Sequence, residues 1–371
     1  MYKKPEFSEQ IDDHYLLWFE SSNSYSLVDD IFYKLLQHYF RSRTKEEFVK
    51  QLEDQYDYSA DLSEHQYRRI EEYLQQFDIA SESVGPPKTF INNRTFSSKY
   101  YTIGKQSVQL SFNEEKVLNL IHPMIAHLET ESQDHIKLQL FIRYKDDELQ
   151  LQKNENPIEI FPSSEYHKLQ GRILFHLINL LHDTDEKDWM GLFHASAVSY
   201  KGRGLLFMGS SGSGKSTLVS LLSAHGFALL ADDTVPIKSG DQHLYLNPSA
   251  VSVKEAALPL VQTFWPHTQS HTPGIVTKGK GNLTYIPMQE HLHTVGVPCS
   301  AVIRVNYQKD TPTQLTPLDI KSALETLIPE SWISPNPQNA KSFMDWLTTV
   351  QFYELSYSDF QEVLPLLKSL K

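Results

Sequence analysis

A glycine-rich stretch at residues 209–216 contains the residue types that bind nucleotide phosphates. It reads GSSGSGKS, which is Gly, four further residues, Gly, Lys and then Ser. Its glycines permit positive φ angles and let the backbone approach an anion closely. The N–H groups at the start of a following helix can donate to phosphate oxygens. The predicted nucleotide-binding residues are Gly209, Ser210, Ser211, Gly212, Ser213, Gly214, Lys215, Ser216 and Thr217.

Two side chains of this stretch predict ATP and Mg²⁺ as its ligands. Lys215 is placed to reach the β- and γ-phosphates, and the Ser216 hydroxyl to bind Mg²⁺. The flanking sequence supports this prediction, because an apolar strand (204–208) precedes the stretch and a helix that ends at Gly226 follows it. The alternative is a glycine- and serine-rich turn that matches the pattern by chance.

An acidic pair follows the helix almost at once. The segment FALLADD (227–233) reads as an apolar strand that ends in Asp232 and Asp233. A strand–helix–strand unit brings this end beside the phosphate-binding stretch. One acid can then serve Mg²⁺, and the other can accept the proton of an attacking hydroxyl group. We assign the metal to Ser216 and Asp233, although the sequence does not distinguish the two acids, and Asp233 alone could instead be a turn residue.

His194 is a further candidate for the catalytic group. It lies fifteen residues before Gly209, on a strand expected to pair with the one that leads into the phosphate-binding stretch. From there an imidazole could orient the two acids or share a proton with them. A single histidine on a strand can equally be structural, and spacing alone does not decide between the two roles.

Composition excludes several classes of function. The 371-residue chain has a formal net charge of −12, which argues against a general binder of nucleic acids or anionic membranes. Its single cysteine, Cys299, excludes an internal disulfide and a cysteine-based metal cluster. The first residues lack the apolar core of a signal peptide, and the most apolar run (173–181) is too short to span a membrane. We therefore expect a cytoplasmic protein.

The pattern of the chain predicts an α/β protein with three parts. Residues 1–80 form a small module: a hairpin with SSNS as its turn, a helix capped by Asp29 or Asp30, a helix capped by Thr44 with Glu47 completing a capping box, and a helix that begins at Ser63. Residues 81–95 contain Gly-Pro-Pro and form a linker.

The rest of the chain divides at residue 165. Residues 96–165 alternate apolar and polar side chains, which predicts a β-rich accessory lobe with one helix near 113–129 and a turn at KDDE. Residues 166–371 form the catalytic domain. It begins with a helix, continues with strands at 191–200 and 202–209 joined at Lys201-Gly202, and ends with a strand, a cap at Ser358 and a final helix.

The segment from HASAVSY to ADDTVPI (194–237) resembles the catalytic domain of bacterial HPr kinase/phosphorylase and its serine-kinase relatives. The resemblance implies a P-loop kinase fold of the HPr kinase and PEP carboxykinase-like type. It also implies that His194, Asp232, Asp233 and Lys215 form the catalytic cluster. The acidic-Arg-Gly signature of true HPr kinases is missing, and SVKEAAL stands at about its place, so Lys254 is a weak candidate for a phosphate contact. Members of this family often form rings, so the resemblance is compatible with a homo-oligomer.

Residues 1–80, with the likeness carried by residues 25–57, resemble the PqqD-like domains, which are small winged-helix modules that bind leader peptides. An unrelated helical module is the alternative. The resemblance implies that an extended peptide adds as a strand along the hairpin edge.

These observations favour an ATP- and Mg²⁺-dependent kinase. It would transfer the γ-phosphoryl group to a Ser or Thr hydroxyl of a peptide or protein, of which a ribosomally made precursor peptide is one example. The alternatives are a kinase for a small molecule such as free serine, and a nucleotide-binding regulator or peptide chaperone without catalysis. The acceptor and the reverse reaction are not identified by the sequence.

Overall fold

The computed structural model describes residues 2–78, 97–132, 135–265, 272–273, 282–288 and 293–370. Helices and several β-sheets alternate along the chain, which confirms the mixed α/β class. The chain divides into two compact units, residues 1–84 with 334–349 and residues 85–333 with 350–371. The predicted linker (81–95) lies outside the described residues, and the predicted domain boundaries stay predictions.

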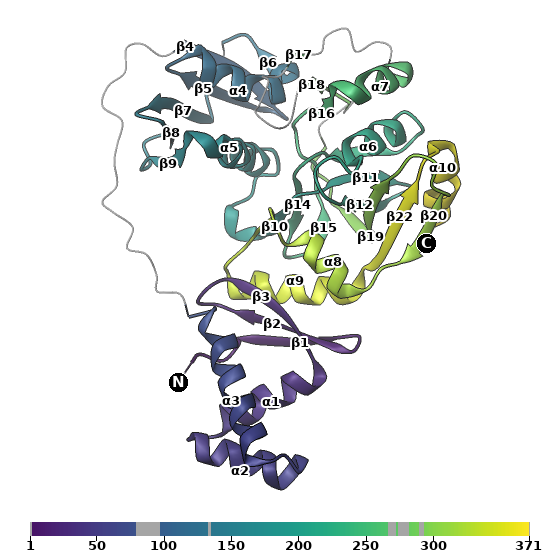
Figure 1. Cartoon of the computed structure of the whole chain (residues 1–371). Coiled ribbons are helices and arrows are strands. Elements are labelled where there is room, and N and C mark those ends of the chain that lie inside the picture. The colour runs from purple at the N-terminus through teal and green to yellow at the C-terminus, as the bar shows by residue number, and fades with distance from the viewer. Residues whose placement is uncertain are drawn as a thin grey trace. The chain divides into compact units, whose positions relative to one another are not determined.

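The first unit contains one sheet and four helices among its described residues (Figure 1). Its elements are β1 (Phe7–Ile11), β2 (His14–Phe19), β3 (Ser24–Asp29), α1 (Asp30–Arg41), α2 (Lys45–Tyr56), α3 (Ala60–Gln75) and α9 (Pro337–Thr349). The antiparallel hairpin β2–β3 confirms the predicted hairpin, and β1 adds a third antiparallel strand beside β2.

Both faces of this sheet are covered. Successive side chains of a strand point to opposite faces, and all four residues from Leu16 to Phe19 are buried. Leu17 and Phe19 belong to the core formed with α1, α2 and α3. On the other face Tyr25, the cross-strand partner of Trp18, contacts Phe343 of α9 with ring centroids 5.0 Å apart. Helix α9 therefore completes this unit, although it lies some three hundred residues further along the chain.

The first turns of α1 and α2 confirm the predicted N-caps Asp29 and Thr44, and they correct the predicted capping box. The carboxylate of Asp29 accepts from the N–H of Phe32, and the hydroxyl of Thr44 accepts from the N–H of Glu47. The Glu47 carboxylate accepts from Arg43 N–H at 2.7 Å, so the predicted reciprocal bond to Thr44 is replaced by one to the residue before it.

The prediction that the third helix begins at Ser63 is wrong. Helix α3 begins three residues earlier, with Ser59 as its N-cap, because the N–H of Ser63 already donates to the Ser59 carbonyl at 2.9 Å. Ser63 is buried inside the helix.

The second unit contains an accessory sheet within residues 97–162, and the helix that the sequence analysis assigned to the catalytic domain (166–181) packs with this sheet. Its elements are β4 (Ser97–Ile103), β5 (Gln106–Phe112), α4 (Glu115–Ile125), β6 (Glu129–Thr130), β7 (Leu138–Lys145), β8 (Glu148–Lys153), β9 (Glu159–Pro162) and α5 (Tyr166–Leu181). The strand order is β6-β4-β5-β7-β8-β9. Apolar residues of α4 and α5 pack with the sheet in one buried core, and this core also includes Leu246 from the catalytic part.

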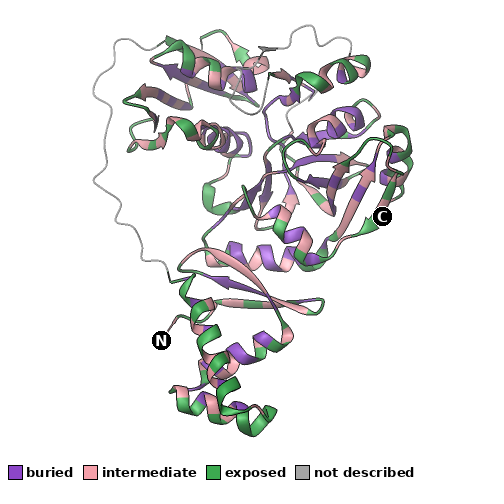
Figure 2. Cartoon of the chain, viewed as in Figure 1, coloured by how far each residue is buried: buried purple, intermediate pink, exposed green. Residues whose placement is uncertain are grey.

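The larger sheet of the second unit carries the predicted phosphate-binding stretch. Its elements are β10 (Trp189–Phe193), β11 (Ser196–Tyr200), β12 (Arg203–Met208), α6 (Lys215–Ser223), β13 (Ala228–Ala231), β14 (Val235–Lys238), β15 (His243–Leu244), β19 (Val297–Tyr307), β20 (Gln314–Pro317), α8 (Ile320–Leu327), β21 (Trp332–Ile333), β22 (Gln351–Tyr357) and α10 (Phe360–Ser369). A smaller sheet contains β16 (Val251–Lys254), β17 (Thr272–Pro273) and β18 (Leu283–Ile286), and α7 (Leu258–Phe264) follows β16. In Figure 2 the strands β10, β11 and β12 are mostly buried, whereas exposed residues gather on α2.

Two local predictions in the second unit are corrected. Residues 191–200 form two strands, because the chain bends at His194 and Ala195, and β10 then pairs with β14 and β21 while β11 pairs with β12 and β13. The final helix is capped by Asp359, whose carboxylate accepts from Gln361 N–H, and not by Ser358, whose hydroxyl donates to the Thr311 carbonyl.

The strand–helix–strand geometry expected around the phosphate-binding stretch is present. β11 is antiparallel to both β12 and β13, so these two strands run in the same direction and their carboxyl ends lie at one edge of the sheet. Over the described residues, no helix combines the length and apolarity that a membrane span requires.

Candidate active site

The phosphate loop (residues 209–216) makes its turns at glycines with positive φ. Gly209 has φ 148°, and a Cβ there would lie 2.7 Å from the Ser213 hydroxyl and 3.1 Å from the Val305 carbonyl. Gly214 is the N-cap of α6 in the left-handed conformation, and its carbonyl accepts from Leu218 N–H at 2.8 Å. Residues with a Cβ would not fit these positions without strain, so the glycine spacing follows from the shape of the loop.

Lys215 lies at the start of α6 with its side chain largely buried. Its Nζ donates to the carbonyl oxygens of Gly209 at 2.5 Å and Ser210 at 3.3 Å. Burial lowers the pKa of Lys215, whereas the nearby carboxylates of Asp233, Asp232 and Glu330 act to raise it. The Lys215 ammonium group therefore lies between the loop carbonyls and these three carboxylates.

Asp232 directly follows β13 and is 2% exposed. Its Oδ1 accepts from the hydroxyls of Ser196 at 2.6 Å and Ser216 at 2.9 Å. Its Oδ2 accepts from the N–H of Ser252 at 3.0 Å and from the hydroxyl of the same residue at 3.2 Å. Burial raises the pKa of Asp232, the neighbouring Asp233 raises it further, and these hydrogen bonds counteract the increase.

A tight turn separates the two acids. Thr234 N–H donates to the Asp232 carbonyl at 2.8 Å, with Asp233 between them at φ 64°. Such a three-residue turn is rare for a residue with a side chain. The side chain of Asp233 is 60% exposed, whereas Asp232 is buried.

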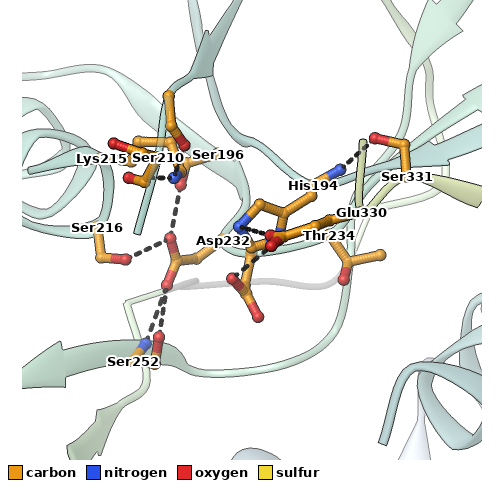
Figure 3. Close-up of polar contacts among 12 residues, drawn as sticks. His194, Ser196, Ser210, Lys215, Ser216, Asp232, Thr234, Ser252, Glu330 and Ser331 are labelled. Atoms are coloured by element: carbon orange, nitrogen blue, oxygen red, sulfur yellow. Dashed lines mark hydrogen bonds and ion pairs between the residues drawn. The ribbon is translucent and has the colours of Figure 1, made fainter. Parts of the chain in front are cut away.

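His194 lies between two carboxylates (Figure 3). Its Nδ1 is 3.4 Å from Asp233 Oδ1, and its Nε2 is 3.5 Å from Glu330 Oε2. The backbone N–H of His194 donates to the Ser331 hydroxyl at 3.0 Å. The sequence analysis placed His194 on a strand. This prediction is wrong, because β10 ends at Phe193 and His194 lies in the bend that follows.

The loop and its neighbours suit a nucleotide phosphate and a hard cation. The first N–H groups of a helix lack partners within it, so those of α6 can bind an anion. The buried Ser213 hydroxyl has no partner among the described residues, and it lies in the loop itself. The Ser216 hydroxyl and the Asp232 carboxylate are oxygen donors of the kind that Mg²⁺ prefers. Within the described ranges, no group of three or more His, Cys, Asp or Glu side chains forms a metal cluster.

One cavity of about 810 Å³ connects these groups with the accessory lobe. On the phosphate side its wall includes Lys215, Ser216, Asp232, Asp233, His194, Lys254 and Glu330. On the opposite side helices α4 and α5 contribute Asn119, Leu120, Met124, Tyr166, His167, Gln170, Gly171 and Leu174. This size is typical of a site for a small molecule or for part of a larger ligand.

The structure brings together all four predicted catalytic residues, His194, Lys215, Asp232 and Asp233. Of the loop residues, Ser211, Gly212, Gly214, Ser216 and Thr217 also line the cavity. Lys254 lies there too, with its Nζ 3.7 Å from the position of a Cβ on Gly212.

Sequence reasoning missed four residues of the site: Ser196, Ser252, Glu330 and Ser331. Ser196 lies two positions after His194, so the His-Ala-Ser spacing was a usable signal for it. Glu330 and Ser331 come from the segment between α8 and β21, where no motif marks them.

Comparisons with known proteins were made by sequence and by structure. No known family model matches the chain, and no curated protein matches it. A solved structure of the Hpr(Ser) kinase/phosphatase from Coxiella burnetii aligns with a TM-score of 0.20 and 16% sequence identity, over 48% of this chain and 90% of that chain. A similarity at this level does not by itself assign a fold or an activity.

Proposed function

We propose that this protein is an ATP- and Mg²⁺-dependent kinase that transfers the γ-phosphoryl group to a Ser or Thr hydroxyl of a peptide or protein. The observation that carries the proposal is that the phosphate loop, Lys215 and two acids in different environments face one cavity. Phosphoryl transfer needs these parts: a cradle for the phosphates, charge neutralisation, and a group that takes a proton.

In this proposal the two acids divide the work. Asp232 is buried, accepts four hydrogen bonds and touches Ser216, so it suits a fixed role next to the cation. This arrangement favours Asp232 over Asp233 as the partner of Ser216 at the metal, whereas the sequence had paired Ser216 with Asp233. Mg²⁺, when bound there, would supply positive charge to the phosphate oxygens.

Asp233 is the proposed general base. Its carboxylate is exposed to the cavity and faces His194. As the acceptor oxygen bonds to the γ-phosphorus, its O–H bond breaks and the proton passes to Asp233, while the bond to the bridging oxygen breaks and ADP leaves. Lys215 stabilises the negative charge on the transferred group.

The accessory-lobe wall supports an acceptor without strong charges near its hydroxyl group. The residues that α4 and α5 contribute to the cavity, as far as the chain is described, include no Asp, Glu, Lys or Arg. Free serine carries an ammonium and a carboxylate group, both of which need counter-charges when they are removed from water. A peptide segment places neither charge beside its hydroxyl, so this wall favours a peptide over free serine.

The first unit is the proposed dock for such a peptide, in keeping with the PqqD-like resemblance. The order β1-β2-β3 leaves β1 and β3 as edge strands of this sheet in the described part of the chain. An extended peptide could add beside β3, the free edge of the β2–β3 hairpin. Helix α9 on one face and α1, α2 and α3 on the other leave the edges as the available positions.

The test is phosphate incorporation from [γ-³²P]ATP into a panel of Ser- and Thr-containing peptides, with free serine assayed in parallel. We expect labelled peptide with the wild-type protein and none with Lys215→Ala. Lys201→Ala, which removes an exposed lysine from the β11–β12 turn, is the matched control and should retain activity.

Each outcome assigns a function. Labelled serine without labelled peptide would favour the small-molecule kinase. ATP binding without turnover under any condition would favour the regulator or chaperone and would contradict the proposed kinase.

A further inference from the structure

Three parallel strands end at the edge of the sheet that carries the phosphate loop. β19 is parallel to β12 on one side and to β22 on the other. β12 leads into the loop, β19 ends at Tyr307, and β22 ends at Tyr357. In α/β sheets, ligands bind outside the carboxyl ends of such strands. The ends of β19 and β22 therefore lie beside the phosphate loop, where the rest of a bound nucleotide can extend.

The ends of these two strands place aromatic rings next to the loop. The rings of Tyr307 and Tyr357 have their centroids 5.4 Å apart, and both residues line the cavity. A Cβ on Gly214 would lie 3.3 Å from the Cβ of Tyr307 and 3.5 Å from the hydroxyl oxygen of Tyr357. The Tyr307 N–H donates to the Ser213 carbonyl at 3.3 Å, so the end of β19 is fixed to the loop.

Apolar and aromatic side chains continue from Tyr307 along this part of the cavity. Tyr307 is 51% exposed and Leu260 of α7 is 48% exposed, which is unusual for large hydrophobic side chains of this protein. Phe264 of α7 and Phe360 of α10 also line the cavity, and their ring centroids lie 5.2 and 5.1 Å from that of His225. α7 and α10 both contact α6 (Figure 1). Tyr307, Leu260, Phe264 and Phe360 are called the aromatic wall below.

The direction of the phosphate chain leads toward this wall. In a loop of this type the lysine, here Lys215, reaches the β- and γ-phosphates, and the proposed base Asp233 acts on the γ-phosphoryl group. The nucleoside must therefore extend away from these two residues. Thr217 and Leu221 lie one turn apart on the same face of α6 and both line the cavity, so the cavity continues from the loop along this helix.

We propose that the aromatic wall is the subsite for the nucleobase and that it takes a purine, with Tyr307 as the main stacking partner. This proposal rests on the proposed function, because it requires the loop to bind a nucleotide. Stacking on an aromatic side chain uses the face of the base and needs no charged group. A purine has two fused rings, so it covers more of the wall than a pyrimidine does and removes more apolar surface from water.

The test measures the binding of ATP and of inorganic tripolyphosphate to the full chain by calorimetry, both with Mg²⁺. Tripolyphosphate can occupy the loop but has no base. We expect Tyr307→Ala to weaken ATP binding by about five- to a hundredfold and to leave tripolyphosphate binding unchanged. Tyr307→Phe keeps the ring and should bind ATP like the wild type. Tyr56→Ala, which removes another exposed tyrosine ring, is the matched control.

A second variant tests the α7 side of the wall. Leu260→Ser should weaken ATP binding by about two- to tenfold, because less apolar surface then meets the base. Leu260 is about half exposed, so its replacement should leave the fold intact. Leu62→Ser is its control, because Leu62 is an exposed leucine of α3 (40%). CTP tests the purine assignment: the wild type should bind it more weakly than ATP, and Tyr307→Ala should reduce the difference.

Three results would overturn the subsite and leave the proposed kinase function intact. The first is ATP binding that neither Tyr307→Ala nor Leu260→Ser changes. The second is a loss of ATP and tripolyphosphate binding by the same factor in Tyr307→Ala, which would show that Tyr307 supports the loop and not the base. The third is a wild-type protein that binds CTP as tightly as ATP. A wild-type protein that binds neither ATP nor tripolyphosphate would contradict the proposed function together with the subsite.

Discussion

Asp232 and Asp233 are neighbours in the chain, but they belong to two differently built sides of the site. On the buried side, Asp232 is held by Ser196, Ser216 and Ser252 through hydrogen bonds of 2.6 to 3.2 Å. On the open side, His194, Asp233 and Glu330 meet at 3.4 to 3.5 Å, and both carboxylates are mostly exposed. A saturated buried network has one stable arrangement, whereas exposed partners can change protonation state at little cost. The comparison indicates that the buried side suits a fixed negative charge, whereas the open side suits the transfer of protons.

Replacement of Asp232 by Asn should have the largest effect, because it disturbs both the fold and the chemistry. An amide cannot accept from the Ser252 N–H and from the serine hydroxyls in the same way, so buried donors lose their partners. We expect the free energy of unfolding to fall by about 2–4 kcal/mol and phosphoryl transfer to fall by about 10²–10³-fold. Urea denaturation and the labelling assay measure the two effects. A variant as stable as the wild type would show that the buried side is not a rigid network.

Asp233→Asn should lower the rate by a similar factor but leave stability unchanged. Loss of the base costs about 10²–10⁴-fold in kcat. Its side chain is exposed, and Asn tolerates positive φ, so the unfolding midpoint should stay the same. Asp146→Asn is the matched control, because Asp146 is also an exposed aspartate with positive φ (53°). A lower unfolding midpoint for Asp233→Asn than for Asp146→Asn would remove the distinction between the two sides.

The pH dependence of nucleotide binding should reveal the position of Lys215 between these sides. Because burial lowers the pKa of Lys215 below 10.5, the ammonium loses its proton at a lower pH than that of a free lysine. ATP affinity should therefore decrease as pH rises, beginning below pH 10.5. Burial raises the pKa of Tyr285 and of Tyr357, so these cavity phenols stay neutral over the same range.

Asp233→Asn sharpens this pH test. The carboxylate of Asp233 is the largest influence that raises the pKa of Lys215, and its removal should move the loss of affinity to still lower pH. Fluorescence titration with a labelled ATP analogue measures the midpoint in both proteins. A midpoint that does not move would contradict the close placement of Asp233 and Lys215.

Lys254→Ala should have the smallest effect of the four. Lys254 is exposed and lies beside Gly212 at the mouth of the phosphate loop. An exposed charge contributes little to binding, so we expect ATP affinity to weaken by about two- to fivefold. The same titration detects this change, with Lys201→Ala as the control. A loss above a hundredfold would place Lys254 among the main phosphate ligands.

The parts of the site that the sequence predicted are those that are close together in the chain. Gly209 to Ser216 and the acids at 232 and 233 lie within one strand–helix–strand unit, whose geometry is fixed by local rules. The different environments of the two acids were not predictable, because they follow from the turn at Asp233 and from Ser252 on a separate strand.

The sequence also did not predict the place of Glu330 or of α9, because both depend on contacts between segments that are far apart in the chain. Glu330 reaches His194 because β21 pairs with β10, which joins segments about 140 residues apart. The capping residues show the same limit on a smaller scale: Thr44 was identified from local spacing, whereas Ser63 was misassigned because Ser59 precedes it with equal capping ability.

The first unit cannot finish folding until α9 has been translated, because α9 covers one face of its sheet. The strands β1, β2 and β3 leave the ribosome early, but one face of their sheet, with Trp18 and Tyr25, waits for a helix that is made near the end of synthesis. At about 5–20 residues per second, that interval lasts roughly 15 to 60 seconds. During that time the nascent chain carries an uncovered aromatic surface, and a translation product that stops before residue 334 would keep it.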